Sequence, residues 1–81
     1  MRVRCEVTTE PFHGEGPLPP HVVAVADAFT AAGLTPDLGP LGTSASGDVS
    51  AVAAVLRDVT SAAFEAGAAR VSVQVERADD E

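Results

Sequence analysis

Several residue types are scarce or missing in this chain of 81 residues, and each gap excludes a class of structure or partner. Cys5 is the single cysteine, so no disulfide can form within the chain. Lysine is absent, and twelve acidic residues against five arginines give a net charge of −7. This charge repels nucleic-acid phosphates and anionic lipid surfaces, so we expect neither nucleic acid nor a membrane as a partner.

Long hydrophobic runs are missing as well. The hydrophobic content of 46% is mostly alanine and valine spread along the chain, which leaves no membrane span and no apolar centre of a signal peptide. We therefore expect a cytoplasmic protein, and a lone cysteine fits a reducing compartment. A chain this short forms one domain with a small core. Burial against further copies of itself is the expected source of additional stability.

Two stretches of strict alternation predict a strand near each end of the chain, at residues 2–8 and 70–76. In each stretch the apolar side chains occupy every second position, so one face of the resulting sheet should cover the core. The predicted inner face carries Val3, Cys5, Val7, Val71, Val73 and Val75, and the outer face carries Arg2, Arg4, Glu6, Thr8, Arg70, Ser72, Gln74 and Glu76.

Apolar residues at three- and four-residue steps predict two helices between these strands. The first follows the proline pair at residues 19–20 and ends at Gly33, while the second has Asp48 as N-cap and ends at Gly67. The apolar stripes are Val22, Val25, Phe29 and Ala32 in the first helix and Val49, Val52, Leu56, Val59 and Ala63 in the second, with Phe64 beside it as a further core residue.

The remaining segments complete the topology. Residues 11–20 contain four prolines and two glycines and are expected to form an exposed loop. Residues 35–46 are interrupted by Gly39-Pro40, which predicts two short strands joined by a turn. The order strand, helix, strand, strand, helix, strand predicts an α+β, ferredoxin-like fold. We expect a four-stranded antiparallel sheet of order 4-1-3-2 with both helices on one face. The domain should span residues 1–78, followed by an acidic tail at 79–81.

Few residues could carry catalysis. A nucleophile needs an adjacent base held by a third group, but Cys5 is on the apolar side of a strand, His13 is in a loop and His21 is at a helix start. A buried structural thiol is the better interpretation of Cys5. His13 with Glu10 and Glu15 is too weak a pattern for a metal site, and one cysteine cannot hold an iron–sulfur cluster. We predict no catalytic residue, no metal and no cofactor.

Several short motifs follow one another in an order that resembles a known family. They are Glu6-Val-Thr-Thr-Glu-Pro, then Pro40-Leu-Gly-Thr ahead of Gly47-Asp48, and finally Phe64-Glu-Ala-Gly-Ala-Ala-Arg-Val. In this order and spacing the chain resembles the small thiamine-binding protein family, with a particular likeness to its actinobacterial members. The loop at residues 11–20 departs from the resemblance, because it is longer and richer in proline.

The resemblance implies a non-enzymatic protein that binds thiamine or its hydroxymethylpyrimidine part and assembles as a dimer or a dimer of dimers through its sheets. An acidic protein attracts the thiazolium cation, and an aminopyrimidine suits a carboxylate or hydroxyl partner. With no tryptophan or tyrosine, Phe12 or His13 would stack on the ligand. The residues carried over by position as ligand-binding are Glu6, Thr8, Gly42, Thr43 and Ser44, with Glu6 as the carboxylate.

Alternatives stand beside these assignments. Glu6 could instead pair with Arg4 or Arg70 across the sheet, and the Thr43 hydroxyl could point toward the helices. For the whole chain, the alternative function is a structural or regulatory interaction domain that binds protein and no small molecule.

Overall fold

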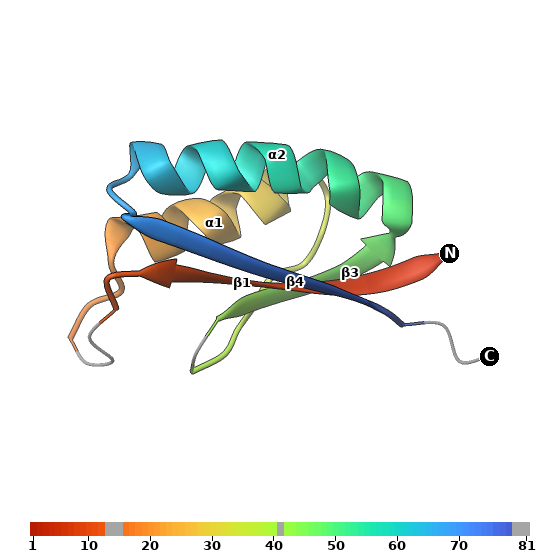
Figure 1. The fold of residues 1–81 in the computed structure, drawn as a ribbon, viewed down its shortest axis with the longest axis horizontal. Coiled ribbons are helices and arrows are strands. Elements are labelled where there is room, and N and C mark those ends of the chain that lie inside the picture. Colours follow the sequence, from red (N-terminus) through yellow and green to blue (C-terminus); the bar gives the residue numbers. More distant parts are fainter. Residues whose placement is uncertain (13–15, 41, 79–81) are drawn as a thin grey trace.

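The structure, a computed structural model, describes residues 1–12, 16–40 and 42–78. The sheet has the order β2-β3-β1-β4 with every neighbouring pair antiparallel, and both helices lie on one face of it (Figure 1). This ferredoxin-like α+β fold confirms the predicted element order and strand order. The elements are β1 (Arg2–Glu10), α1 (Pro20–Ala31), β2 (Asp37–Leu38), β3 (Thr43–Asp48), α2 (Val49–Glu65) and β4 (Arg70–Arg77).

The ends of both helices follow from their local sequence. α1 begins with Pro20 in its first turn, where a missing N–H costs nothing. α2 begins after Asp48, whose carboxylate accepts a hydrogen bond from the Ser50 backbone N–H at 3.1 Å. Each helix then ends at a glycine with positive φ, +85° at Gly33 and +106° at Gly67, and the following N–H returns to the helix. All four predicted helix ends are confirmed.

The core lies between the sheet and the two helices. Val3, Cys5 and Val7 fill its sheet side, as predicted, and Val25 and Phe29 fill the α1 side. The face that α2 buries is rotated about the helix axis by part of a turn from the predicted stripe. Its buried residues are Val52, Val55, Val59 and Ala63, while Val49 and Phe64 are exposed and Leu56 is partly buried.

Three further residues differ from their expected burial. Ala32, at the end of the predicted first stripe, is exposed. β4 also departs from expectation, since Val73 and Val75 remain 38% and 48% exposed. The β1–β4 register aligns Val73 with Val7 and Val75 with Cys5, so both valines are on the predicted inner face. They are uncovered because β4 is the outermost strand of the sheet.

Candidate functional site

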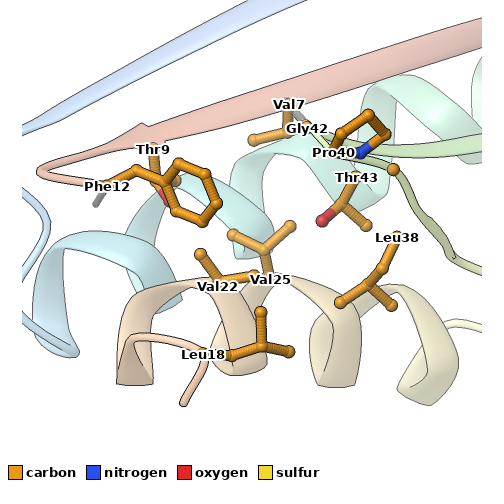
Figure 2. A pocket seen from close by; sticks show the side chains of 11 residues that line it. Val7, Thr9, Phe12, Leu18, Val22, Val25, Leu38, Pro40, Gly42 and Thr43 are labelled. Carbon is orange, nitrogen blue, oxygen red and sulfur yellow. The ribbon is translucent and has the colours of Figure 1, made fainter. Parts of the chain in front are cut away.

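A partly enclosed pocket lies at the end of the core where β1, α1 and the β2–β3 hairpin meet (Figure 2). Its volume is about 140 Å³. The lining comprises Val7, Thr9, Phe12, Leu18, Val22, Val25, Leu38, Gly39, Pro40, Gly42 and Thr43. Most of these side chains are apolar, so the pocket suits a flat hydrophobic ring better than an isolated ion.

Large apolar side chains surround the mouth of the pocket. Phe12 and Leu18 come from the loop before α1 and are 40% and 50% exposed, and Leu38 at the end of β2 is 45% exposed. The hairpin that carries Leu38 is closed by the Gly39 N–H, which donates to the Gly42 carbonyl at 2.9 Å. This turn holds one apolar wall opposite the loop. Exposed apolar groups gathered around a concavity mark a surface that can bind a partly hydrophobic ligand.

Two buried hydroxyl groups supply the polar part of the lining. Thr43 is only 3% exposed, and its hydroxyl oxygen points into the pocket (Figure 2). Thr9 is 5% exposed, and its hydroxyl lies 2.7 Å from Nδ1 of His21. A hydroxyl both donates and accepts hydrogen bonds, so each threonine can bind either an amino group or a ring nitrogen.

The sequence interpretation missed the Thr9–His21 pair. His21 was placed at a helix start, yet it is 4% exposed and shares one face of α1 with Val25 and Phe29, four and eight residues further on. That spacing was a usable signal, because residues four apart lie above one another on a helix. Thr9 likewise continues the alternation of β1 beyond residue 8, onto the inner face.

The five predicted ligand-binding residues divide between the two faces of the sheet. The β1–β3 register pairs Glu6 with Ser44 and Val7 with Thr43. Because paired residues share a face, Ser44 lies on the outer face with Glu6 and Thr8, whereas Thr43 lies on the helix side. The structure therefore brings Glu6, Thr8 and Ser44 together but separates them from Thr43. The alternative orientation of Thr43, toward the helices, is the one observed.

Gly42 lines the pocket and also lies next to residues of the outer face. A Cβ added to it would stand 3.0 Å from the Thr8 hydroxyl and 3.0 Å from the Val7 carbonyl oxygen. The Val7 oxygen belongs to the backbone and cannot move aside as a flexible side chain would. A side chain at this position would press against the β1 backbone, so glycine is favoured where the hairpin approaches β1 this closely.

The outer face of the sheet carries a shallow, polar depression lined by Glu6, Thr8, Ser72 and Gln74. The nearby arginines are paired elsewhere: Arg4 lies 3.7 Å from Glu76, and Arg70 lies 4.0 Å from Glu10. Within the described part of the chain Glu6 forms no ion pair, so the alternative pairing with Arg4 or Arg70 is not observed. The Glu6 carboxylate remains available at this depression.

Groups able to carry redox or nucleophilic chemistry are poorly placed. Cys5 is fully buried, and desolvation by this burial raises the pKa of its thiol, which disfavours the reactive thiolate. Over the described ranges, no three His, Cys, Asp or Glu residues gather as metal ligands would. His13 and Glu15 of the weak metal pattern lie outside the described residues, as do Leu41 of the hairpin motif and the predicted tail at 79–81.

In the residues that the structure describes, neither helix combines the length and hydrophobicity that crossing a bilayer requires.

Comparison with solved structures returns small proteins of the same architecture. A hypothetical protein from Methanocaldococcus jannaschii superposes with a TM-score of 0.70 at 22% identity, over 99% of this chain and 84% of that one. A Bacillus cereus domain of unknown function, DUF77, gives a TM-score of 0.66 at 17% identity, over 93% of this chain and 72% of that one. At these identities the likeness shows the fold alone.

A Thermotoga maritima protein, whose description links it to thiamine biosynthesis or salvage, gives a TM-score of 0.68 at 16% identity. That match covers 94% of this chain and 81% of the other. No curated protein matches the sequence. Among family profiles, the one described as "Thiamine-binding protein" matches residues 5–81.

Proposed function

Since this chain belongs to the thiamine-binding protein family, we propose that it binds thiamine, or the hydroxymethylpyrimidine part of thiamine, without catalysing a reaction on it. The pocket beside Thr9 and Thr43 is the observation that carries this proposal. It joins an apolar lining to two buried hydroxyls. The Thr9 hydroxyl lies beside the His21 imidazole, but in the described residues no third group hydrogen-bonds to that imidazole to orient it as a base. The lone cysteine, buried as a free thiol, supports a cytoplasmic setting for this binding protein.

The volume of the pocket limits how much of the ligand can be enclosed. An apolar cavity of about 150 Å³ accommodates a benzene ring, and this pocket measures about 140 Å³. One six-membered ring therefore fits, and a two-ring ligand would leave its second ring at the mouth. We place the aminopyrimidine inside and the thiazolium outside. There the exposed ring of Phe12 offers a π-face to the positive charge.

The two hydroxyls match the hydrogen-bonding edge of the aminopyrimidine. That edge presents an amino donor next to a ring-nitrogen acceptor, and a pair of threonine hydroxyls can satisfy both. Of the residues predicted from the sequence, Thr43 and Gly42 belong to this pocket. Glu6 and Thr8 line a competing depression on the outer face, where Glu6 would supply a carboxylate, and Ser44 is the β3 residue paired with Glu6.

Calorimetric titration with thiamine, thiamine diphosphate and hydroxymethylpyrimidine tests the proposal. We expect saturable heat and a raised thermal midpoint with at least one of them. No heat and no thermal shift with any of the three at millimolar concentration would contradict ligand binding itself.

A matched pair of variants locates the site. Thr43→Val removes a hydroxyl from the pocket, and Thr8→Val makes the same change on the outer face. Loss of one hydrogen bond should weaken ligand binding about threefold to tenfold in Thr43→Val and leave Thr8→Val unchanged. The opposite ranking would assign the ligand to the depression that contains Glu6.

The second candidate function is an interaction domain that binds no small molecule. Its support is the outer sheet face, where a mixed set of charges and hydroxyls is free to stack on the same face of another copy, as in a dimer of dimers. In that case Glu6→Ala should change the mass of the assembly while none of the three ligands gives a response. A thiamine response that survives complete dissociation into monomers would count against this candidate.

A further inference from the structure

A buried hydrogen bond joins the wall of the pocket to the helix behind it. The Thr9 hydroxyl on β1 lies 2.7 Å from Nδ1 of His21 on α1, and the two residues are 5% and 4% exposed. Of these two residues, Thr9 lines the pocket and His21 stands behind it. Any effect of His21 on a bound ligand therefore passes through the Thr9 hydroxyl.

The direction of this hydrogen bond follows from the partners that each group has. A neutral imidazole carries one N–H and one acceptor nitrogen, while a hydroxyl has one proton and two lone pairs. Within the described residues, Nδ1 of His21 is the one hydrogen-bond partner of the Thr9 hydroxyl. If Nδ1 donated, the Thr9 proton would find no acceptor in the protein, and an unpaired buried donor is costly. The favoured arrangement has Thr9 donating to Nδ1, with the imidazole proton on Nε2.

This arrangement gives the two hydroxyls of the pocket different roles. With its proton held by His21, Thr9 presents only lone pairs to a ligand, so it accepts a hydrogen bond and cannot donate one. The Thr43 hydroxyl points into the pocket and has no hydrogen-bond partner among the described residues (Figure 2). Thr43 can therefore donate or accept. The pocket combines one fixed acceptor with one adaptable group.

The two hydroxyls are close enough for one ring to contact both. Val7 is paired with Thr43, and Thr9 is two residues further along the same face of β1. Thr9 and Thr43 are therefore diagonal neighbours, with Cα atoms about 7–8 Å apart. A pyrimidine ring between them can donate from its amino group to Thr9 and accept the Thr43 proton at a ring nitrogen.

We propose that His21 is a positioning residue, which holds the Thr9 hydroxyl proton and so makes the pocket selective for a 4-aminopyrimidine over the corresponding 4-oxopyrimidine. The inference rests on the proposed function, since it requires the pyrimidine ring to occupy this pocket. An amino group donates to Thr9, whereas an oxo group brings its own lone pairs against those of Thr9. A site that leaves a buried polar group unpaired with the wrong ligand discriminates against that ligand.

The preference between two neutral ligands tests the role of His21. Hydroxymethylpyrimidine and its 4-oxo analogue differ at one group, and calorimetric titration of both at pH 8 gives the ratio of their affinities. We expect the unmodified chain to bind the amino compound at least about tenfold more tightly. His21→Leu frees the Thr9 hydroxyl to rotate and donate, so this ratio should fall about threefold to tenfold. A purely structural loss would weaken both ligands alike and leave the ratio unchanged.

Two further variants show whether His21 acts through Thr9. His21→Asn supplies a side-chain carbonyl that can accept the Thr9 proton in place of Nδ1, and it should recover most of the preference. In a Thr9→Val background there is no hydroxyl to orient, so adding His21→Leu should leave the ratio of affinities unchanged.

The tautomer of His21 can be measured without any ligand. The chain has two histidines, so a His13→Ala variant leaves His21 as the single source of imidazole signals. Nitrogen-15 NMR of this variant at pH 8 distinguishes a ring nitrogen that carries a proton from one that accepts a hydrogen bond. We expect the proton on Nε2 and an acceptor at Nδ1.

Two results would overturn the inference and leave the proposed function intact. One is a ring proton on Nδ1 of His21 in the ligand-free chain. The other is binding of hydroxymethylpyrimidine whose preference over the oxo analogue is the same in His21→Leu, with circular dichroism showing that the variant is folded. If neither compound nor thiamine binds, the proposed function fails and the role of His21 fails with it.

Discussion

At the scale of single residues, Asp48 joins the sheet to the second helix. It ends β3 and accepts hydrogen bonds from the Ser50 hydroxyl at 2.6 Å and the Ser50 backbone N–H at 3.1 Å. The N-terminal ammonium of Met1 lies 3.3 Å from its other oxygen. These donors, with the two Ser50 hydrogen bonds first, lower the pKa of Asp48 to about 2. The ionised carboxylate is therefore the form that stabilises the native state.

This lowered pKa predicts an acid-dependent loss of stability. Because the folded pKa lies below the ordinary value of 3.8, the contribution is complete above about pH 4 and is lost as the pH falls through about 2. Asp48→Asn retains a capping acceptor but has no charge to lose. In urea unfolding, the stability difference between the unmodified chain and Asp48→Asn should shrink steadily from pH 5 to pH 2.

The variant Ser50→Ala tests whether the Ser50 hydrogen bonds are what lowers the pKa of Asp48. Ser50→Ala removes the hydroxyl that makes the shorter of the two Ser50 hydrogen bonds to Asp48, so the stability of this variant should fall less steeply with acid. An equal fall in both chains would contradict the assigned cause.

The predicted binding residues show how far the sequence determines the face of the sheet on which a side chain lies. Gly42, Thr43 and Ser44 are consecutive, and consecutive side chains of a strand point to opposite faces. One surface can therefore not include the side chains of both Thr43 and Ser44. Alternation alone was sufficient to separate them. Which of the two faces holds a pocket depended on the loop at Phe12 and the hairpin at Pro40, which close over the helix side only.

At the scale of elements, the two helices end by the same motif but place their phenylalanines differently. In α1 the N–H of Leu34 returns to the carbonyl of Phe29, and in α2 the N–H of Ala68 returns to Ala63. Phe64 thus stands one position later in its helix end than Phe29 does. One position is a rotation of about 100° about the helix axis. That rotation takes Phe64 out of the core, where it is 48% exposed, while Phe29 is fully buried.

The two phenylalanines should therefore differ sharply when truncated. Phe29→Ala leaves a cavity in the core and should cost about 3–5 kcal/mol of unfolding free energy. Phe64→Ala removes the same atoms from a half-exposed site and should cost much less. Urea denaturation at one low protein concentration measures both. Similar losses would mean that Phe64 is packed far more tightly than its exposure indicates.

At the scale of the whole molecule, the net charge of −7 surrounds the pocket with a negative field. If thiamine is the ligand, its permanent cation gains from this field, whereas hydroxymethylpyrimidine is neutral at pH 7 and does not. Salt shortens the screening length from about 10 Å at 0.1 M to about 3 Å at 1 M. We expect thiamine binding to weaken several-fold between about 20 mM and 1 M NaCl, with hydroxymethylpyrimidine binding nearly unchanged in parallel titrations. An equal salt effect on thiamine and on hydroxymethylpyrimidine binding would contradict the electrostatic contribution of the net charge.

The order of elements, the helix ends and the face of each residue in β1 and β4 followed from the sequence alone. These depend on periodicity, on glycine and on capping groups, all of which act within a few residues. Which apolar residues are covered becomes evident only in the folded chain, because coverage depends on where the helices rest on the sheet. Val73 and Val7 share a face, yet Val73 is 38% exposed and Val7 is 2% exposed. The pocket was decided in the same way, since it requires contacts such as that between Thr9 and His21, which lie on different elements.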